Sequence, residues 1–198
     1  MPFAGWLLCG MSVWTFLSNQ IGAAAGSYAT NKGTCIEYNL NHFAYLIVKQ
    51  LATMPIFAVF VVILAYIDWT TGSMSISSYI YALFYVFCMC LVAFPIALIL
   101  LVFGVFFRDI QSALGILLQI IMWSSPIFWN PQTVPRTMVS FMEFNPMFYP
   151  ITGLRHVIFE APPPSPEAMY KFALVVVGTS IFGGWCYSAS SKYFGDHA

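Results

Sequence analysis

A long stretch without charged side chains most constrains how this chain can fold. No Asp, Glu, Lys or Arg occurs in residues 79–107, which are rich in Leu, Phe, Val and Ile. At about 1.5 Å per residue, a helix of this length exceeds the roughly 30 Å hydrocarbon core of a bilayer. The stretch therefore predicts a membrane-spanning helix. We expect a bend at Pro95, because proline removes one backbone hydrogen bond.

The rest of the chain is similarly apolar. Of its 198 residues, 60% are hydrophobic, 18% aromatic and only 7% charged, whereas a soluble domain is about 25% charged. Seven basic and seven acidic residues give zero net charge, so no basic stripe is available for nucleic acid. The composition predicts one all-α polytopic membrane domain over residues 1–198 and argues against nucleic acid as a partner.

Five apolar segments predict five membrane-spanning helices, which cover residues 3–26, 43–67, 79–107, 110–128 and 169–189. Asn19 and Gln20 lie in the first segment, where we expect them to face protein or a water-filled path rather than lipid. The connection 27–42 is polar, and we predict a loop there.

Residues 130–167 form the longest polar region, yet they retain many apolar and aromatic side chains. A water-exposed linker would be more polar throughout. The region predicts two short helices that re-enter the membrane or pack over the bundle, with prolines marking their ends. Because it follows the fourth span, we interpret it as an outer gate region.

Short polar motifs flank the fourth segment. Arg108-Asp109 precedes it, with Asp109 near the positive end of the helix dipole and Arg108 at headgroup level. This arrangement can be structural, or it can also transmit motion from a cytoplasmic partner. At the other end, Ser124-Ser125-Pro126 either satisfies backbone groups around a proline break or acts as a hinge for an outer gate.

The distribution of basic residues predicts a cytoplasmic C-terminus. Four basic residues fall on the side that carries the C-terminus and three on the opposite side, a weak positive-inside bias. The first group is Lys32, Lys49, Arg108 and Lys192, and the second is Arg136, Arg155 and Lys171.

Motifs for catalysis or ion coupling are absent from the sequence. It contains no His-Glu-x-x-His, no phosphate-binding loop and no Gly-x-Ser-x-Gly, and its cysteines show no metal-ligand spacing. The interiors of the predicted spans carry no ionisable residue except Lys49 near an end, so the energy for any transport would come from another chain. The alternative class is a membrane enzyme acting on lipid-linked sugars through Arg155, His156 and Glu160.

The order of several motifs resembles that of a known family, the permease subunits of type-2 ABC exporters for bacterial polysaccharides. These systems export O-antigen, capsule and teichoic acid chains. The similarity covers about residues 3–189 and rests on the order and spacing of the motifs, each of which is weak alone. The motifs are Pro2-Phe3, Trp14, Ser18-Asn19, Phe106-Phe107-Arg108-Asp109-Ile110, Ser125-Pro126-Ile127-Phe128, Asn145-Pro146 and Gly153-Leu154-Arg155.

The resemblance implies a subunit of the bacterial inner membrane that pairs with a second copy and two ATP-binding ABC subunits. ATP and Mg would bind the ATPase, and this chain would bind no cofactor or metal. The substrate would be a lipid-linked polysaccharide; a small-molecule or drug exporter of the same superfamily is the alternative. The family's first span has no counterpart here, so we expect the chain to lack it.

The resemblance also implies roles for particular residues. One group would contact the ATPase from the cytoplasmic side: Asn31, Lys32, Thr34, Glu37, Arg108 and Asp109. A second group would form the outer gate and its hinge: Ser125, Pro126, Trp129, Asn145, Pro146 and Arg155.

Overall fold

The computed structural model describes residues 3–37, 42–53, 55, 59–60, 62–63, 66, 76–107 and 110–196. All regular structure in these residues is helical, which confirms the all-α prediction for the described part of the chain. The elements are α1 (Phe3–Glu37), α2 (His42–Ala52), α4 (Ile76–Phe106), α5 (Ile110–Ser124), the 3-10 helix η1 (Pro131–Thr133), α6 (Arg136–Met142), α7 (Phe148–Phe159) and α8 (Pro166–Asp196).

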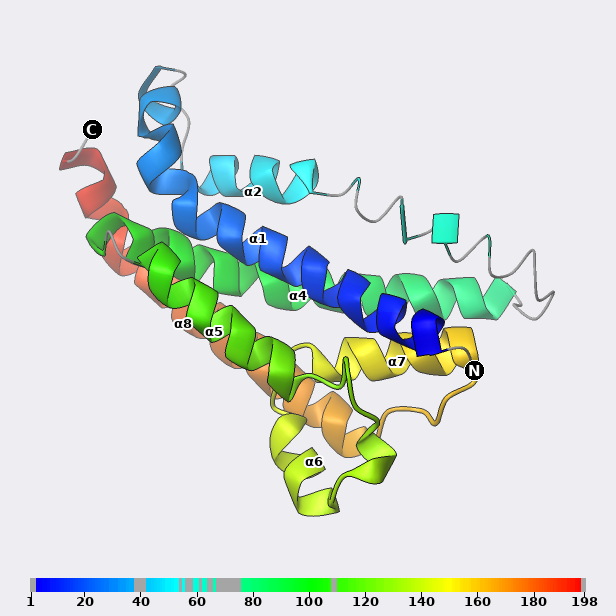
Figure 1. Cartoon of the computed structure of the whole chain (residues 1–198). Helices are drawn as coiled ribbons and strands as arrows, with labels where there is room; N and C mark the ends of the chain where they lie inside the picture. Colours follow the sequence, from blue (N-terminus) through cyan, green and yellow to red (C-terminus); the bar gives the residue numbers. More distant parts are fainter. Residues whose placement is uncertain are drawn as a thin grey trace.

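Helix α4 lies at the centre of the fold. Helices α1 and α8 pack along it, and α7 packs against it near one end (Figure 1). Ala93 and Ala97 of α4 are fully buried, as are Val13 and Leu17 of α1. Small side chains on the central helix let its neighbours approach closely, which is how helices associate where lipid surrounds them.

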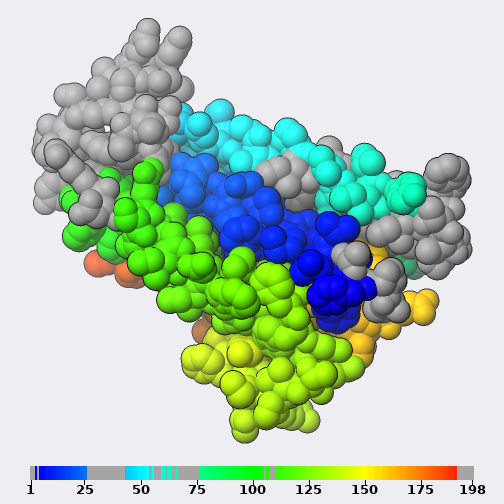
Figure 2. Space-filling view, in the orientation of Figure 1, coloured from blue at the N-terminus to red at the C-terminus, as the bar shows by residue number. Residues whose placement is uncertain are grey.

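The long helices share one general direction, so the molecule has two distinct ends (Figure 1). The start of α1, η1, α6, α7 and the start of α8 gather at one end. The C-terminal ends of α1, α4 and α8 and the start of α5 gather at the other. We call residues 125–165, at the first end, the cap. Figure 2 shows α1, α5 and the cap forming one continuous surface.

The five predicted crossings are matched only in part. By length and composition, two helical stretches among the described residues can cross a membrane, Ile76–Gly104 and Pro166–Ser190. They correspond to the predicted spans 79–107 and 169–189. Helix α2 is apolar but short, and much of the predicted span 43–67 lies outside the described residues.

Some predicted boundaries were wrong. We predicted a loop from residue 27, but α1 continues to Glu37. The predicted span 169–189 is shorter than the helix that contains it, because α8 continues to Asp196. Residues 27–37 and 190–196 contain no proline. A helix can continue from the membrane into water when its side chains become polar, because polarity does not itself break the backbone hydrogen bonds. The predicted span 110–128 is also too long, because α5 ends at Ser124, just before Pro126.

Asn19 and Gln20, the polar pair in the first predicted span, have different surroundings. Gln20 is buried, and its Nε2 donates to the backbone carbonyl of Gln50 in α2 at 3.4 Å. This confirms that Gln20 faces protein. Asn19 lies instead on the exposed surface of the described residues.

Candidate functional site

A tight turn follows α5, and its sequence explains its shape. The Ile127 N–H donates to the Ser125 carbonyl at 2.7 Å, so Pro126 is the central residue of a three-residue turn. The fixed φ of proline suits that position and prevents the helix from continuing. The hydroxyls of Ser124 and Ser125 donate to the Ile121 carbonyl at 3.0 and 2.6 Å, which satisfies an acceptor that the helix end leaves open.

Asn145 connects this turn to the start of α7. Its Nδ2 lies 3.0 Å from the Ile121 carbonyl, 2.8 Å from Ser124 Oγ and 3.0 Å from Ser125 Oγ. Its Oδ1 accepts from the Met147 N–H at 2.9 Å, as a short polar side chain commonly does at a turn before a helix. One side chain therefore orients both the end of α5 and the approach to α7.

Arg155 of α7 makes the longest-range polar contacts in the cap. Its Nη1 donates to the Pro126 carbonyl, and its Nη2 donates to the Trp6 and Ile127 carbonyls, each at 3.0 Å. The guanidinium also lies 3.8 Å from the centre of the Trp6 ring. Arg155 thus joins the start of α1, the turn after α5 and α7.

The charge of Arg155 is buried without a carboxylate beside it. The side chain is only 1% exposed, and it forms no ion pair with any carboxylate that the structure describes. Burial lowers the pKa of the guanidinium to about 10, so it stays charged at neutral pH. Backbone carbonyl dipoles and the face of Trp6 stabilise this charge instead.

Two glycines allow α7 and its arginine to lie this close to the bundle. A Cβ placed on Gly153 would lie 2.0 Å from the Tyr85 ring of α4, which no side chain could occupy. A Cβ on Gly10 of α1 would lie 3.0 Å from Arg155 Nη2. Close backbone approach, rather than an unusual backbone conformation, explains glycine at both positions.

A charged pair links the cap to the last helix. Lys171 of α8 lies 2.7 Å from Glu143 Oε2 and donates to the Ser140 carbonyl at 2.8 Å. The other carboxylate oxygen of Glu143 accepts from Ser165 Oγ at 3.0 Å, and that hydroxyl caps α8 by accepting from the Ala168 N–H. A serine followed by proline is a common start for a helix, so the sequence explains this cap.

The six residues predicted for the outer gate lie in one region. Ser125 and Asn145 bond one another, and Arg155 bonds the carbonyl of Pro126. Pro146 directly follows Asn145, and Trp129 Nε1 donates to the Trp123 carbonyl at 3.3 Å. The sequence carries no signal for the partners of Arg155 or for the Glu143–Lys171 contact. A weak indication of that contact is that two opposite charges in so apolar a chain tend to form an ion pair.

The residues predicted to contact the ATPase stay a prediction, because the structure does not describe their side chains. Asn31, Lys32, Thr34 and Glu37 lie on the C-terminal part of α1, at the end away from the cap, and their side chains are outside the described set. Arg108 and Asp109 also lie outside the described residues.

The residues named for the alternative enzyme do not form one site. Arg155 lines a cavity with Trp6 and Glu143, whereas His156 and Glu160 line another with Tyr81. The His156 ring nitrogen Nδ1 lies 2.6 Å from the Ala161 carbonyl, at the end of α7. Adjacent positions on a helix point about 100° apart, which explains the separation.

These features define a helical membrane protein whose short helices are hydrogen-bonded over one end of its bundle. The family model described as ABC-2 type transporter matches residues 3–159, so the chain belongs to that family. It is therefore the membrane domain of an ABC transporter, a class that works with an ABC ATPase. Comparison of the chain with curated proteins gives no match.

Proposed function

We propose that this permease subunit exports lipid-linked polysaccharide across the bacterial inner membrane, in a complex with two ATPase subunits and a second copy of itself. The cap would close the outer end of the export path. The observation that carries this role is the attachment of the cap by side chains of Asn145 and Arg155 to the end of α5 and the start of α1. Such hydrogen bonds can break and reform as the two helices move.

Energy would reach the cap through α5. In this proposal the ATPase contacts Arg108, Asp109 and residues 31–37 at the end of α1, and the C-terminus lies on the same cytoplasmic side. Helix α5 then connects that end directly to the Ser125-Pro126 turn, with which the cap begins. A movement of α5 would change the distance between Pro126 and Arg155, which supports a role for this contact in gating.

A drug exporter of the same superfamily is the second candidate. Its support is the apolar character of a cavity beside α1, lined by Leu8, Val13, Phe16, Val59, Phe60 and Ile63 among others. We favour polysaccharide because aromatic side chains are abundant and the described part of the chain has polar side chains along a second cavity in the cap.

Association and cell-surface measurements together test this function. The tagged chain should co-purify with a candidate ABC ATPase from the same organism and raise its rate of ATP hydrolysis in proteoliposomes. Deleting the gene should remove one surface polysaccharide and leave drug sensitivity unchanged. Increased drug sensitivity with intact surface glycan would favour the drug exporter, and absence of any ATPase association would contradict both.

Replacing Pro126 with alanine tests the hinge. Pro126→Ala keeps the carbonyl that accepts from Arg155 but restores an N–H and relaxes φ, so α5 can extend past Ser124. We expect surface glycan to fall about tenfold while the amount of folded protein in the membrane stays within about twofold. Equal loss of protein and glycan would show that the proline is needed only for folding. Pro135→Ala, in the same cap but exposed, is the matched control.

A further inference from the structure

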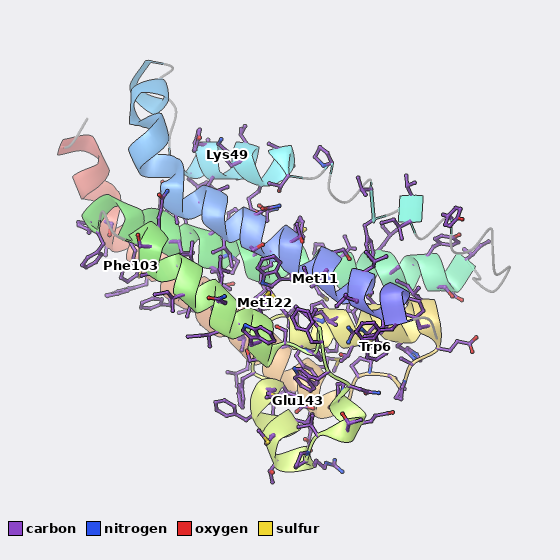
Figure 3. All side chains as sticks on the ribbon, viewed as in Figure 1. Trp6, Met11, Lys49, Phe103, Met122 and Glu143 are labelled. Carbon is purple, nitrogen blue, oxygen red and sulfur yellow. The ribbon has the colours of Figure 1, made fainter. Side chains whose placement is uncertain are left out.

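The apolar cavity beside α1 is large enough to hold part of a lipid. It has a volume of about 300 Å³, and Met89 of α4 and Ile158 and Phe159 of α7 complete its wall beside residues 5–16 of α1. Met11, which Figure 3 labels on α1, is one of the lining residues. A methylene group fills about the volume of one water molecule, roughly 30 Å³, so the cavity has room for about ten of them.

The mouth of this cavity is apolar and open to the surroundings of the protein. Leu8 and Val59 on its wall are each 60% exposed, and Ile63 is 37% exposed. In a membrane domain such side chains are compatible with the bilayer, because lipid tails are as apolar as leucine. An acyl chain can therefore enter the cavity sideways from the bilayer without crossing a polar surface.

A polar cavity adjoins the apolar one at Ile158, which lines both. The polar cavity has a volume of about 290 Å³ and lies between the start of α4 and the end of α7. Its polar lining residues are Ser77, Ser78, Tyr81, His156 and Glu160. An apolar and a polar cavity that share a wall match the tail and the headgroup of an amphiphile.

Glu160 gives the polar cavity a negative charge. Its side chain is exposed, and among the described residues it forms no ion pair. Neither lysine nor arginine is present among the residues that line the cavity. An unpaired carboxylate attracts a cation and repels an anion, so the cavity favours a headgroup that carries a positive charge.

His156 adds a hydrogen-bond acceptor to the same cavity. Its Nδ1 lies 2.6 Å from the Ala161 carbonyl, and a carbonyl can only accept, so Nδ1 carries the hydrogen. In the neutral ring Nε2 is then an acceptor, and the Tyr81 hydroxyl can accept as well. A primary ammonium carries three N–H donors for such acceptors, whereas a trimethylammonium carries none.

We propose that the two cavities together bind one molecule of phosphatidylethanolamine. One acyl chain would occupy the apolar cavity, and the ammonium would bind Glu160 and His156. The lipid would come from the bilayer leaflet at the cap end and would fill the space between α1, α4 and the end of α7. The proposal needs only the membrane location of the chain, so it is independent of the exported substrate.

Native mass spectrometry of the purified full chain in mild detergent tests this site. The chain is mixed with equal amounts of phosphatidylethanolamine, phosphatidylcholine and phosphatidylglycerol that carry identical acyl chains. Phosphatidylethanolamine should be retained at least about fivefold more than either of the others, because only its headgroup offers charged N–H donors. Equal retention of phosphatidylethanolamine and phosphatidylcholine, or preference for phosphatidylglycerol, would overturn the proposal.

A polyprenyl phosphate distinguishes a bilayer lipid from the carrier of a lipid-linked substrate. Its headgroup is anionic and has no ammonium, so Glu160 should repel it. We expect it to displace phosphatidylethanolamine only at concentrations at least about fivefold higher. Tighter binding of the polyprenyl phosphate would assign the cavities to the carrier and contradict the proposal.

A charge-removing variant tests the headgroup contact. Glu160→Gln keeps the size of the side chain but removes its charge, so the preference for phosphatidylethanolamine over phosphatidylcholine should fall to within about twofold. Glu167→Gln is the matched control, because Glu167 is also exposed but lines neither cavity. The control should keep the full preference. An unchanged preference in Glu160→Gln would refute recognition of the ammonium.

A space-filling variant tests the tail contact. Leu8→Trp should block the mouth of the apolar cavity and lower the retention of phosphatidylethanolamine and phosphatidylcholine alike, by at least about fivefold. Leu174→Trp, at a position of α8 that is 51% exposed and lines neither cavity, should leave retention unchanged. Both leucines are exposed, so neither change disturbs the core. Full lipid retention by Leu8→Trp would show that the acyl chain does not lie in this cavity.

Discussion

Arg155→Met should lower the stability of the chain by about 3 to 5 kcal/mol, because it removes the guanidinium donor from three backbone carbonyls, two of which are buried. Those carbonyls belong to Trp6, Pro126 and Ile127, and the contact with the Trp6 ring is lost as well. For a chain of this size, such a loss corresponds to a melting temperature lower by roughly 10 °C. Thermal unfolding of the detergent-purified protein, followed by tryptophan fluorescence, measures it.

Two other substitutions make that result interpretable. Arg155→Lys keeps the charge but replaces the planar guanidinium with a point-like ammonium, so we expect an intermediate loss of stability. Arg136→Met removes an exposed arginine from the same cap and should change stability by less than about 0.5 kcal/mol. If Arg155→Met and Arg136→Met unfold at the same temperature, the carbonyl contacts of Arg155 contribute little to stability.

Gly153→Ala should destabilise the packing of α7 on α4 by about 2 to 3 kcal/mol through steric overlap. The new methyl group would lie 2.0 Å from Tyr85 Cε1 and 2.2 Å from Cζ, so the ring has to move. That ring packs edge-on against Tyr149, which in turn stacks on Phe172 of α8 at 5.2 Å. A displaced Tyr85 would therefore disturb three helices. The expected measurement is a lower midpoint of thermal or denaturant unfolding.

A matched glycine and a second-site change test the steric explanation. Gly115 lies on α5, and a Cβ placed there meets nothing within 4 Å, so Gly115→Ala should be neutral or stabilising by up to about 1 kcal/mol. Tyr85→Ala makes room for the methyl group, so adding Gly153→Ala to it should cost less than about 0.5 kcal/mol more. An unchanged penalty in the double variant would mean that the ring is not the obstacle.

Local sequence predicted a proline break at Ser124-Ser125-Pro126, because serine and proline act on the backbone within a few residues. The structure has a turn there, but α5 ends at Ser124, whereas the predicted span continued to residue 128. Polar composition was a poorer guide. It suggested a loop after residue 26, whereas α1 continues to Glu37, since polarity decides where a helix is solvated rather than where it ends.

The sequence alone determined that this is a helical membrane protein, and that the region before its last helix is rich in apolar residues and divided by prolines. The uncharged stretch at 79–107 is long enough to cross a bilayer, where a helix satisfies all its backbone hydrogen bonds within the segment. Only the tertiary structure decided what Arg155 does. Its acceptors are backbone carbonyls of residues 6, 126 and 127. Every residue carries a carbonyl, so no side chain in the sequence could mark these three. They become binding partners only when α1, the turn after α5 and α7 meet.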